Sequence, residues 1–224
     1  RYRRSWEAVT ILNRLWREER VDFQGAFYQL EQAVSEPKTL TQPRPPFYTV
    51  GLSDIAKDMA ASEGDVHLMQ CDSPHNLKIH VDDITKRARR QGRSLRFGLR
   101  AQLVVRDTEQ EAWDRLREML SRVDPRTLAS RQKEYKKMSA VEAGRLVEDA
   151  LNSHLLAPNV WNGMHNIKSG AGTVLVGSTE QLIDRCYSYF QAGIDVFIFS
   201  SYPHIGEAKI AGEIFLPGLM NRLM

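Results

Sequence analysis

The sequence predicts an α/β protein with parallel strands, and two observations indicate this fold class. β-favouring runs alternate with helical patterns, and the alternation starts anew at Phe47, Asp65, Leu95 and Val196. Strands that alternate with helices in this way pair in parallel through right-handed crossovers. The composition, 42% hydrophobic and 26% charged over 224 residues, is that of an ordinary globular protein. The fold is therefore either a doubly wound sheet or a (β/α)8 barrel.

The N-terminal region predicts a helix and a hairpin. Apolar residues recur at helical spacing from Ser5 to Glu19, as in an amphipathic helix. The segment from Val21 to Tyr28 alternates around a glycine, which favours a small hairpin. Prolines then exclude regular structure before the strand at Phe47, and they are Pro37, Pro43, Pro45 and Pro46.

The stretch from Phe47 to Ala61 predicts a strand, a turn and a helix. β-favouring residues lead into the turn Gly51-Leu52-Ser53-Asp54, and a helical pattern follows at once. The first N–H groups of a helix lack partners, so Ser53 can cap them, and the helix dipole favours an anion there. Ser53 is therefore either a simple N-cap or part of a binding site for one phosphate.

Two further strand-helix units follow. Asp65 to Met69 and Leu95 to Val105 read as strands, the second interrupted by Gly98. Leu77 to Arg90 and Glu109 to Arg122 read as the helices that follow them. Basic residues close the first of these helices, where they complement the dipole of its C-terminus.

The alternation fails between residues 123 and 173. A polar helical stretch from Arg131 to Asp149 precedes the glycine-rich loop from Lys168 to Thr173. The glycines match neither nucleotide-binding motif, GxxxxGK[ST] or GxGxxG. A connection of about fifty residues far exceeds the usual length, and such excursions are commonly lids or binding loops. We expect residues 123–173 to form a mobile insertion before the last strand.

Regular structure returns after this insertion. Ser178 and Gln181 have the spacing of a capping box and open a helix that runs to about Gln191. Val196 to Phe199 is a fully apolar strand, and Glu207 to Leu216 is a final helix. The chain thus contains four strand-helix units in a single domain, which is half of an eight-stranded barrel. Either the sheet is doubly wound, or the first four units are absent, and the start at Arg1 without a Met indicates a fragment.

Composition excludes several classes of protein. The net charge is only +3, and no block of five like charges indicates a nucleic-acid partner. Cys71 and Cys186 form no CxxC motif and have no nearby His pair, so neither zinc nor a disulfide framework is expected. No run of about 18 apolar residues and no export signal is visible. We expect a cytoplasmic protein without a bound metal or a membrane segment.

Candidate functional residues gather where strands end, because sites in parallel α/β proteins lie at the carboxyl edge of the sheet. They are cationic and hydrogen-bonding, and they include no paired carboxylates and no Ser-His-Asp arrangement, so glycoside or ester hydrolysis is poorly supported. Arg100 needs an anionic partner if it points inward. Tyr202 and His204 have structural alternatives as a packing and a capping residue, and Cys71 as a small buried hydrophobe. The candidates are Ser53, Gln70, Cys71, Arg100, Gln102, Lys168 and residues 200–204.

Several motifs together resemble the bacterial luciferase-like, flavin-dependent monooxygenases, and most closely their alkanesulfonate monooxygenase branch. The resemblance covers essentially the whole chain, and the motifs are specific only in combination. They are Tyr2 to Trp16, Gln42-Pro43-Arg44-Pro45-Pro46, Gly51 to Ala56, Arg96-Phe97-Gly98-Leu99-Arg100, Pro158-Asn159-Val160-Trp161, Ser169 to Gly177, and Gly193 to Ala208.

The resemblance implies the C-terminal half of a (β/α)8 TIM barrel that binds FMN at its mouth. Leu52 and Ser53 match the turn that lies near the flavin phosphate in this family. Arg100 matches an arginine of the sulfonate pocket, and Tyr202 matches a pocket tyrosine after the last strand. Lys168 stands where the family has an arginine on a mobile loop. Lysine keeps the positive charge but lacks the planar guanidinium group, which binds an anion through two hydrogen bonds.

Two further positions depart from the sulfonate pattern, and we assign both to substrate binding. Gln70 replaces a tryptophan of the family, and Gln102 replaces a histidine two residues after Arg100. Glutamine does not titrate near neutral pH as histidine does. Both substitutions weigh against a sulfonate substrate more than against the flavin-binding scaffold.

The resemblance therefore implies an enzyme that uses reduced FMN (FMNH2) and O2 to oxygenate a small organic substrate, for example an alkanesulfonate or another organosulfur compound. A separate NAD(P)H-dependent flavin reductase would supply the cofactor, and we expect a homo-oligomer. Catalysis would depend on Arg100, Tyr202 and Lys168. Two alternatives remain, namely an inactive flavin-binding or assembly relative and a truncated fragment without independent function.

Overall fold

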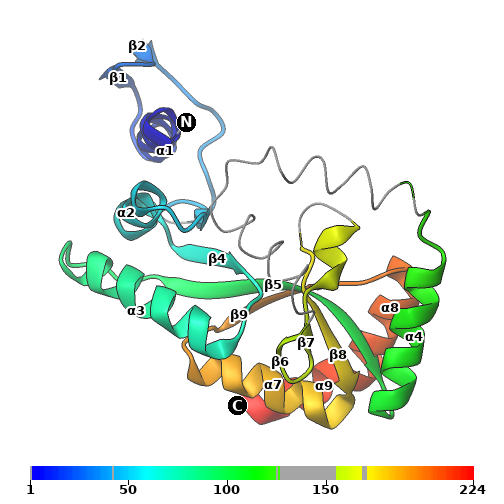
Figure 1. Ribbon diagram of the computed structural model, residues 1–224. Coiled ribbons are helices and arrows are strands. Elements are labelled where there is room, and N and C mark those ends of the chain that lie inside the picture. Colours follow the sequence, from blue (N-terminus) through cyan, green and yellow to red (C-terminus); the bar gives the residue numbers. More distant parts are fainter. Residues whose placement is uncertain (1, 42, 125, 127–154, 168–170) are drawn as a thin grey trace. The chain divides into compact units, whose positions relative to one another are not determined.

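The computed structural model describes residues 2–41, 43–124, 126, 155–167 and 171–224 (Figure 1). The chain divides into two compact units. The first unit comprises Arg1–His67 and Ile84–Leu95, and the second comprises Leu68–Asp83 and Arg96–Met224. The boundary passes through strand β4 (Val66–Gln70) and helix α3 (Pro74–Arg89), so each unit holds part of both elements.

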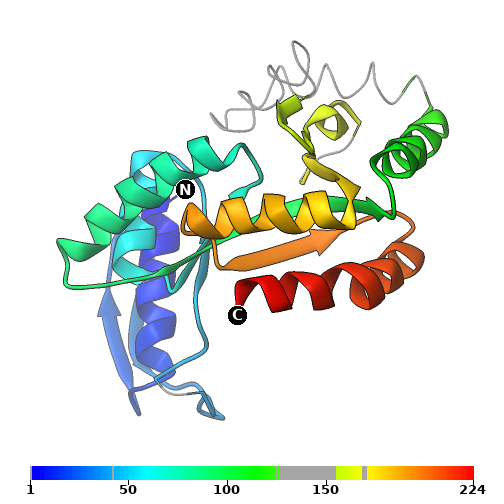
Figure 2. The same cartoon turned by 90° about the horizontal axis from the view of Figure 1, so that it is seen from below.

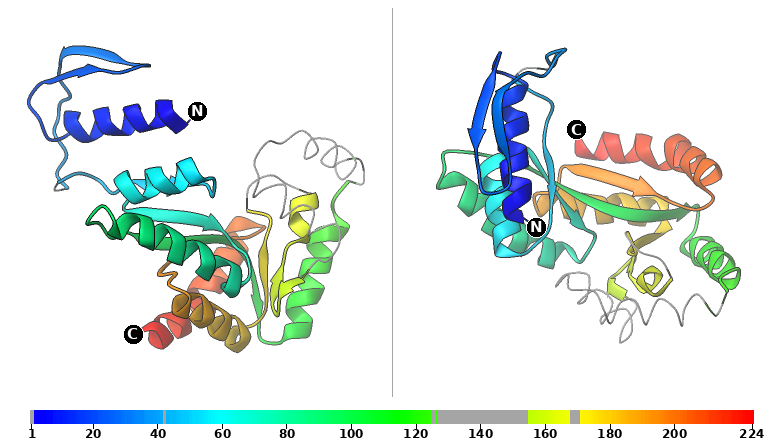
Figure 3. Two further views of the ribbon diagram at one scale, coloured as in Figure 1. Left: turned by 60° about the vertical axis from the view of Figure 1, so that its left-hand side comes forward. Right: turned by 90° about the horizontal axis from the view of Figure 1, so that it is seen from above.

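The first unit combines one helix, one hairpin and the first strand-helix pair. Figure 3 shows α1 between the hairpin and α2. The strand-helix pair at Phe47 lies where the sequence predicts it, and the N-terminal helix is confirmed but begins at Tyr2 and ends at Leu15, three to four residues earlier than predicted. The elements that lie wholly in this unit are α1 (Tyr2–Leu15), β1 (Val21–Gln24), β2 (Gln29–Ala33), β3 (Tyr48–Val50) and α2 (Asp54–Glu63).

The hairpin extends further along the chain than the sequence predicts. Its second strand is Gln29–Ala33, because the residues before it form the turn. The Glu7 carboxylate of α1 holds this turn by accepting the backbone N–H groups of Ala26, Phe27 and Tyr28 at 2.9, 2.9 and 3.2 Å. The predicted bounds, 21 to 28, were therefore wrong for the second strand, since a turn held by a distant carboxylate leaves no local pattern.

A cation fixes the entry into β3. The Arg44 guanidinium is nearly buried, lies 4.0 Å from the centre of the Phe47 ring and pairs with the Asp65 carboxylate. The same carboxylate accepts the Phe47 N–H at 2.7 Å, and the Asp65 N–H donates to the Phe47 carbonyl at 3.0 Å. These bonds place the start of β3 beside the start of β4, which orients the turn at Gly51.

The second unit carries most of the sheet. The strands follow the order β4-β5-β8-β7-β6, and β9 also pairs with β5. The antiparallel pairs β6–β7 and β7–β8 come from the region without a predicted strand. Besides parts of β4 and α3, the unit contains β5 (Arg96–Arg106), α4 (Glu109–Ser121), β6 (Leu155–Ala157), β7 (Val160–Trp161), η1 (Gly163–Asn166), β8 (Val174–Ser178), α7 (Thr179–Gln191), β9 (Val196–Ser200), α8 (His204–Ile210), η2 (Ala211–Phe215) and α9 (Leu216–Leu223).

Strand β5 is the centre of this unit, and two strands share one of its edges. Its Arg100 carbonyl accepts the Cys71 N–H at 3.2 Å, and its Gln102 N–H donates to the Thr173 carbonyl at 2.8 Å. Residues 100 and 102 are two apart, so their backbone N–H and carbonyl groups point to the same edge of β5. Strand β4 therefore ends, and β8 begins, along that one edge. The Phe97 carbonyl accepts the Asp195 N–H at 3.0 Å, so β9 occupies the opposite edge.

Helices cover one face of β5 and β9. Figure 2 shows α7 and α9 running alongside these two strands. Leu99 is fully buried on this face, and Phe199 of β9 meets Phe215 edge-on with ring centres 5.6 Å apart. A second apolar cluster lies among α4, β5, β7, η1 and β8, and its buried members are Val104, Ala112, Leu116, Trp161, Met164, Val174 and Val176.

The structure departs from the sequence prediction in two places of the second unit. Residues 155–178 contain three strands and a 3₁₀ helix, which were expected to belong mostly to one long loop. The final helix divides into α8, a π-helical turn (η2) and α9, and it starts at His204 and continues to Leu223. The capping box of Ser178 and Gln181 is confirmed, with both reciprocal hydrogen bonds present.

Other expectations concern residues outside the described ranges. The predicted helical stretch from 131 to 149 and Lys168 both lie there, so the expected lid stays a prediction. Within the described ranges, no helix is long and apolar enough to cross a membrane.

Candidate functional site

Three of the predicted site residues share one face of the second unit's sheet. A Cβ added to Gly98 would meet Leu68 Cδ2 at 2.6 Å and Val196 Cβ at 3.0 Å, so these three residues face the same side. Side chains alternate along a strand, so Gln70 shares that side with Leu68, and Arg100 and Gln102 share it with Gly98. We call this side the Arg100 face, and it comprises Gln70, Gly98, Arg100, Gln102, Ile198 and Ser200.

The residues of the Arg100 face also lie at similar heights along their strands. Gln70 is the last residue of β4, and the next N–H bonds to the Arg100 carbonyl. In the parallel pairing with β9, Arg100 lies opposite Ile198 and Gln102 lies opposite Ser200. Neighbouring strands are about 4.8 Å apart, so these side chains project from one small area, which lies at the ends of β4 and β9 and in the middle of β5.

Arg100 provides the charge of this area. Its side chain is exposed, and it makes no ion pair or side-chain hydrogen bond with any residue in the described part of the chain. Other arginines of the unit are engaged, for example Arg96 with Asp195 and Arg106 with Glu207. The Arg100 guanidinium is therefore available to an anion that the described residues do not supply.

Gln102 is 99% buried and is tied to the chain that enters β8. Its side-chain Nε2 donates to the Ala171 carbonyl at 3.3 Å, and its backbone N–H donates to the Thr173 carbonyl. Its Oε1 has no hydrogen-bond partner among the described residues, and neither has the buried Oε1 of Gln70. The predicted substrate-binding pair thus presents two buried acceptors on the Arg100 face.

Tyr202 follows β9 in a loop held by several contacts. Its peptide bond to Pro203 is cis, and its ring lies 4.5 Å from the His204 ring. Its carbonyl accepts a hydrogen bond from Arg115 Nη2 at 3.2 Å. The side chain is 41% exposed and comes two residues after Ser200, the residue opposite Gln102. The structure places Tyr202 beyond the end of the strand that borders Arg100.

A buried ion cluster supports this loop, and the sequence reasoning missed it. The Glu207 carboxylate accepts two bonds from Arg106, at 2.7 and 3.0 Å, and one from Arg115 Nε at 2.9 Å. Burial alone would raise the pKa of the Glu207 carboxyl, but hydrogen bonds from Arg106 and Arg115, together with their charges, outweigh burial and lower that pKa. Arg115 thereby links Glu207 to the Tyr202 carbonyl.

A small cavity of about 170 Å³ lies on the helix side of β9 and α8. Its walls include Leu103, Phe199 and Ser201, which alternate with the residues of the Arg100 face. Glu207 also borders it. Most of the lining thus lies on the opposite side of these strands, although Ser200, a residue of the Arg100 face, also lines the cavity.

Leu52 and Ser53 belong to the first unit. Gly51 has a φ of +112°, a conformation that glycine adopts readily, and it turns the chain from β3 toward α2. Ser53 occupies the N-cap position as predicted, but its side chain makes no capping hydrogen bond. The nearby Asp54 carboxylate is paired with Arg87 at 2.7 Å. The first turn of α2 therefore has no side-chain cap, and the negative charge of Asp54 beside it is paired with Arg87.

Cys71 is confirmed as a small buried residue. Its Sγ lies 3.3 Å from the Tyr189 hydroxyl, which donates to the Asp72 carbonyl at 2.7 Å. Burial raises the pKa of the Cys71 thiol to about 12, although the hydrogen bond with Tyr189 opposes the shift. Such a thiol is not a nucleophile at neutral pH. In the described ranges, no group of three or more His, Cys, Asp or Glu side chains has metal-binding geometry.

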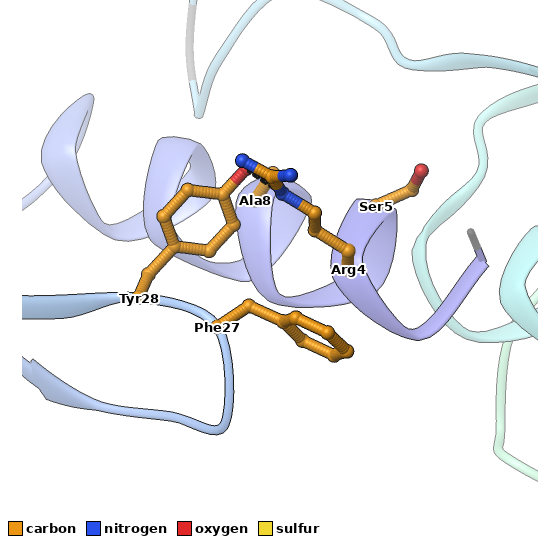
Figure 4. A pocket seen from close by; sticks show the side chains of 5 residues that line it. All are labelled: Arg4, Ser5, Ala8, Phe27 and Tyr28. Carbon is orange, nitrogen blue, oxygen red and sulfur yellow. Dashed lines mark hydrogen bonds between the residues drawn. The ribbon is translucent and has the colours of Figure 1, made fainter.

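The first unit also carries a surface hollow that the sequence did not indicate. It has a volume of about 540 Å³ and is lined by Arg4, Ser5, Ala8, Phe27 and Tyr28 (Figure 4). Arg4 Nε donates to the Tyr28 hydroxyl at 3.1 Å, which joins α1 to the hairpin. Arg4 and Tyr28 are used in this contact between α1 and the hairpin, so we assign no ligand to the hollow.

Comparison with known proteins identifies the fold. The profile of the family described as luciferase-like monooxygenase matches residues 1–196. The crystal structure of a long-chain alkane monooxygenase is 19% identical, with a TM-score of 0.75, and the alignment covers 99% of this chain and 56% of that structure.

Two further solved structures are similar at comparable identity. A riboflavin lyase, determined with modified FMN and the substrate riboflavin, is 17% identical with a TM-score of 0.75, covering 99% of this chain and 57% of that one. An EDTA monooxygenase from Chelativorans sp. BNC1 is 18% identical with a TM-score of 0.74, covering 99% and 60%. The chain thus spans a little over half the length of these structures. The likeness confirms the α/β fold of part of a luciferase-like TIM barrel.

Proposed function

We propose that this chain, which belongs to the luciferase-like monooxygenase family, forms part of an enzyme that uses reduced FMN and O2 to oxygenate a small organic substrate. The observation that carries the proposal is the unpaired Arg100, which lies in the middle of β5 beside the carboxyl ends of β4 and β9, within a family matched over residues 1–196. Ligands of parallel α/β folds bind at this end of the strands.

The start of α2 fits the phosphate of FMN. Its first turn has no side-chain cap from Ser53, so backbone N–H groups there can bind an anion, and the helix dipole favours one. Leu52 and Ser53 would hold the phosphate, and Arg87 already neutralises the neighbouring Asp54. When bound, the reduced flavin supplies the electrons for the activation of O2.

The Arg100 face is the surface that would bind the substrate. Arg100 would bind the anionic group of the substrate, and Gln70 and Gln102 would orient the remainder through their amides. Tyr202 would donate a hydrogen bond from its loop, and Lys168 would add a second positive charge. An organosulfur compound, for example an alkanesulfonate, satisfies Arg100. We further propose that a separate NAD(P)H-dependent reductase supplies the cofactor and that the protein is a cytoplasmic homo-oligomer.

The phosphate site is tested by flavin binding. We expect FMN to bind at least about ten-fold more tightly than riboflavin, which lacks the phosphate, because an ionic group at a helix start adds about 1–2 kcal/mol. Ser53→Asp should weaken FMN binding and leave riboflavin binding unchanged, as measured by quenching of flavin fluorescence. Ser121→Asp, at an exposed position, is the matched control. Equal affinities for FMN and riboflavin would contradict the phosphate site.

Substrate binding is tested separately by oxygen consumption. With reduced FMN supplied by a reductase, substrate should stimulate O2 uptake, and Arg100→Ala should raise KM at least about ten-fold while FMN still binds. Arg100→Lys should show a smaller rise in KM than Arg100→Ala, because lysine keeps the positive charge but lacks the guanidinium group. Arg90→Ala, also at an exposed position, is the control. A KM that is the same in Arg100→Ala as in the wild type excludes Arg100 from the substrate site.

A further inference from the structure

We propose that the substrate carries an N–H or O–H donor beside its anionic group, because the amide oxygens of Gln70 and Gln102 form two buried, unpartnered acceptors next to Arg100. The inference rests on the proposed function, since it assumes that the Arg100 face binds the substrate. It narrows the substrate class from small anions in general to those that can donate hydrogen bonds.

Unpartnered acceptors of this kind are uncommon. The Oε1 atoms of Gln70 and Gln102 are both buried, and neither has a hydrogen-bond partner in the ranges that the structure describes. More than about 90% of buried polar groups in proteins are partnered, and leaving one unsatisfied costs about 1–3 kcal/mol. Two such oxygens on neighbouring strands therefore indicate a binding partner that is not among the described residues.

The orientation of the Gln102 amide follows from its other contact. Its Nε2 donates to the Ala171 carbonyl at 3.3 Å, and turning the amide around would place two oxygens against each other. The atom left without a partner is therefore the carbonyl oxygen and not the amino group. The backbone bond from Gln102 to Thr173 holds the strand in place at the same residue.

The positions of the two acceptors suit one small molecule. Gln102 lies two residues from Arg100 on the same face of β5, so their Cα atoms are about 7 Å apart. Gln70 projects from the adjacent strand, about 5 Å away. An anionic group on Arg100 and a donor group a few bonds away would satisfy the guanidinium and at least one amide oxygen together.

The chemistry of these groups discriminates between substrate classes. A plain alkanesulfonate or a hydrocarbon has no N–H or O–H group, so its binding would bury both oxygens permanently without partners. An amide, an amine or a hydroxyl group supplies the missing donor. A site with buried acceptors rejects an analogue that lacks the donor more strongly than an apolar pocket rejects a missing methylene.

The ring N–H groups of a flavin are a second possible source of donors. We assign the acceptors to the substrate because both lie beside Arg100, whose unpaired charge is available to an anion within the same small area. The phosphate of FMN has its own proposed seat at the start of α2. Flavin affinity therefore has to be measured together with substrate affinity.

The test uses two probes that differ only in the donor. Succinamate and 4-oxopentanoate share a carboxylate and the same number of heavy atoms, and an NH₂ group in the first replaces a CH₃ group in the second. Titration calorimetry on the full chain with FMN should show that succinamate binds about five- to thirty-fold more tightly, as one or two hydrogen bonds imply. The affinity of each variant for FMN is measured in the same way without either probe.

Variants then connect the preference to the two glutamines. Gln70→Met keeps the length of the side chain and should reduce the ratio of the two affinities toward one, and Gln102→Met should do the same. The exposed Gln91→Met is the matched control and should leave the ratio unchanged. Because Gln70 is only partly buried, Gln70→Met should fold even if Gln102→Met does not.

Each outcome separates the inference from the proposed function. Equal affinities for the two probes, with FMN bound and with Arg100→Ala weakening both, would overturn the inference and leave the proposed function intact. An unchanged ratio in Gln70→Met and Gln102→Met would also overturn it. A loss of flavin affinity in these variants at an unchanged ratio would assign the donors to the cofactor and overturn it as well. Absence of FMN binding, or no effect of Arg100→Ala, would refute the proposed function itself.

Discussion

Gly98 shows how closely the strands approach on the Arg100 face. A side chain at this position would meet Leu68 Cδ2 at 2.6 Å and both the Cβ and the carbonyl oxygen of Val196 at 3.0 Å. The leucine tip can move, but the backbone of β9 cannot move without disturbing its pairing with β5. The glycine that interrupts the strand pattern is therefore a packing requirement of the sheet.

We expect Gly98→Ala to lower the free energy of unfolding by about 1–3 kcal/mol, because the added methyl group overpacks the interface between β4, β5 and β9. Urea denaturation measures the change. Gly212→Ala is the matched control, because an added Cβ there has nothing within 4 Å, and it should be neutral or slightly stabilising. Equal stability of the two variants would contradict the close packing at Gly98.

Individual site residues differ in how far the sequence predicts them. Gln70 was correctly expected at a strand end, but Arg100 and Gln102 lie in the middle of β5, because this strand continues to Arg106 past the ends of β4 and β9. Glu207 was recognised only as the start of a helix, since its partner Arg106 lies 101 residues away in the sequence. A buried carboxylate of this kind has no local pattern, so only the three-dimensional structure reveals it.

At the scale of elements, the Glu207 cluster ties α8 to β5 and α4. Three charge-assisted bonds from Arg106 and Arg115 end on one buried carboxylate. Removal of the carboxylate would leave two partly buried guanidinium groups without their partner. The cluster therefore connects the position of the Tyr202 loop to the centre of the sheet.

Glu207→Gln should destabilise the protein by about 2–3 kcal/mol at pH 7, because it removes the charged partner of two arginines. The pKa of Glu207 is lowered in the folded state, so its stabilisation is complete above the unfolded pKa, near 4.3, and is lost as the pH falls through the folded pKa. The difference between wild type and variant, measured by urea denaturation, should therefore shrink below about pH 4.5.

The exposed Glu31→Gln is the control for this experiment, and it should have no effect at either pH. A difference between wild type and Glu207→Gln that stayed constant from pH 7 to pH 3 would show that the carboxylate does not titrate as described.

Elements with local signals were predicted well, and the others were not. The capping box at Ser178 was predicted because both of its residues lie within one turn. The preceding strand β8 was missed, because the glycine-rich approach from residue 170 to 172 resembles a loop. Strands β6 and β7 contain only three and two residues, too few to show a period.

At the scale of the whole molecule, apolar side chains remain exposed on strands of both units. Val50 and Tyr48 of β3 are 63% and 52% exposed, and Ile198 of β9 is 37% exposed. Strands with such surfaces readily pair with another chain. The chain also spans little more than half the length of the structures that it resembles.

We expect the 224-residue chain to associate as its concentration rises, and light scattering after gel filtration measures this. Replacing Val50 and Ile198 by Thr, which keeps the preference for strands, should reduce the association. Ile205→Thr changes an isoleucine that is 89% exposed on helix α8 and serves as the control. A monodisperse monomer at all concentrations, or an equal effect of the control, would contradict the role of the strands.

The pairing of both β4 and β8 with one edge of β5 determines which mutations the protein tolerates. β4 and β8 follow one another along that edge, and Gln102 binds the returning chain at Ala171 and Thr173. A shift of β5 by one residue would break its contacts with both strands and with Ala171 together, and it would turn Arg100 to the opposite face of the sheet. The protein should therefore tolerate side-chain changes along this edge better than an insertion or a deletion within β5.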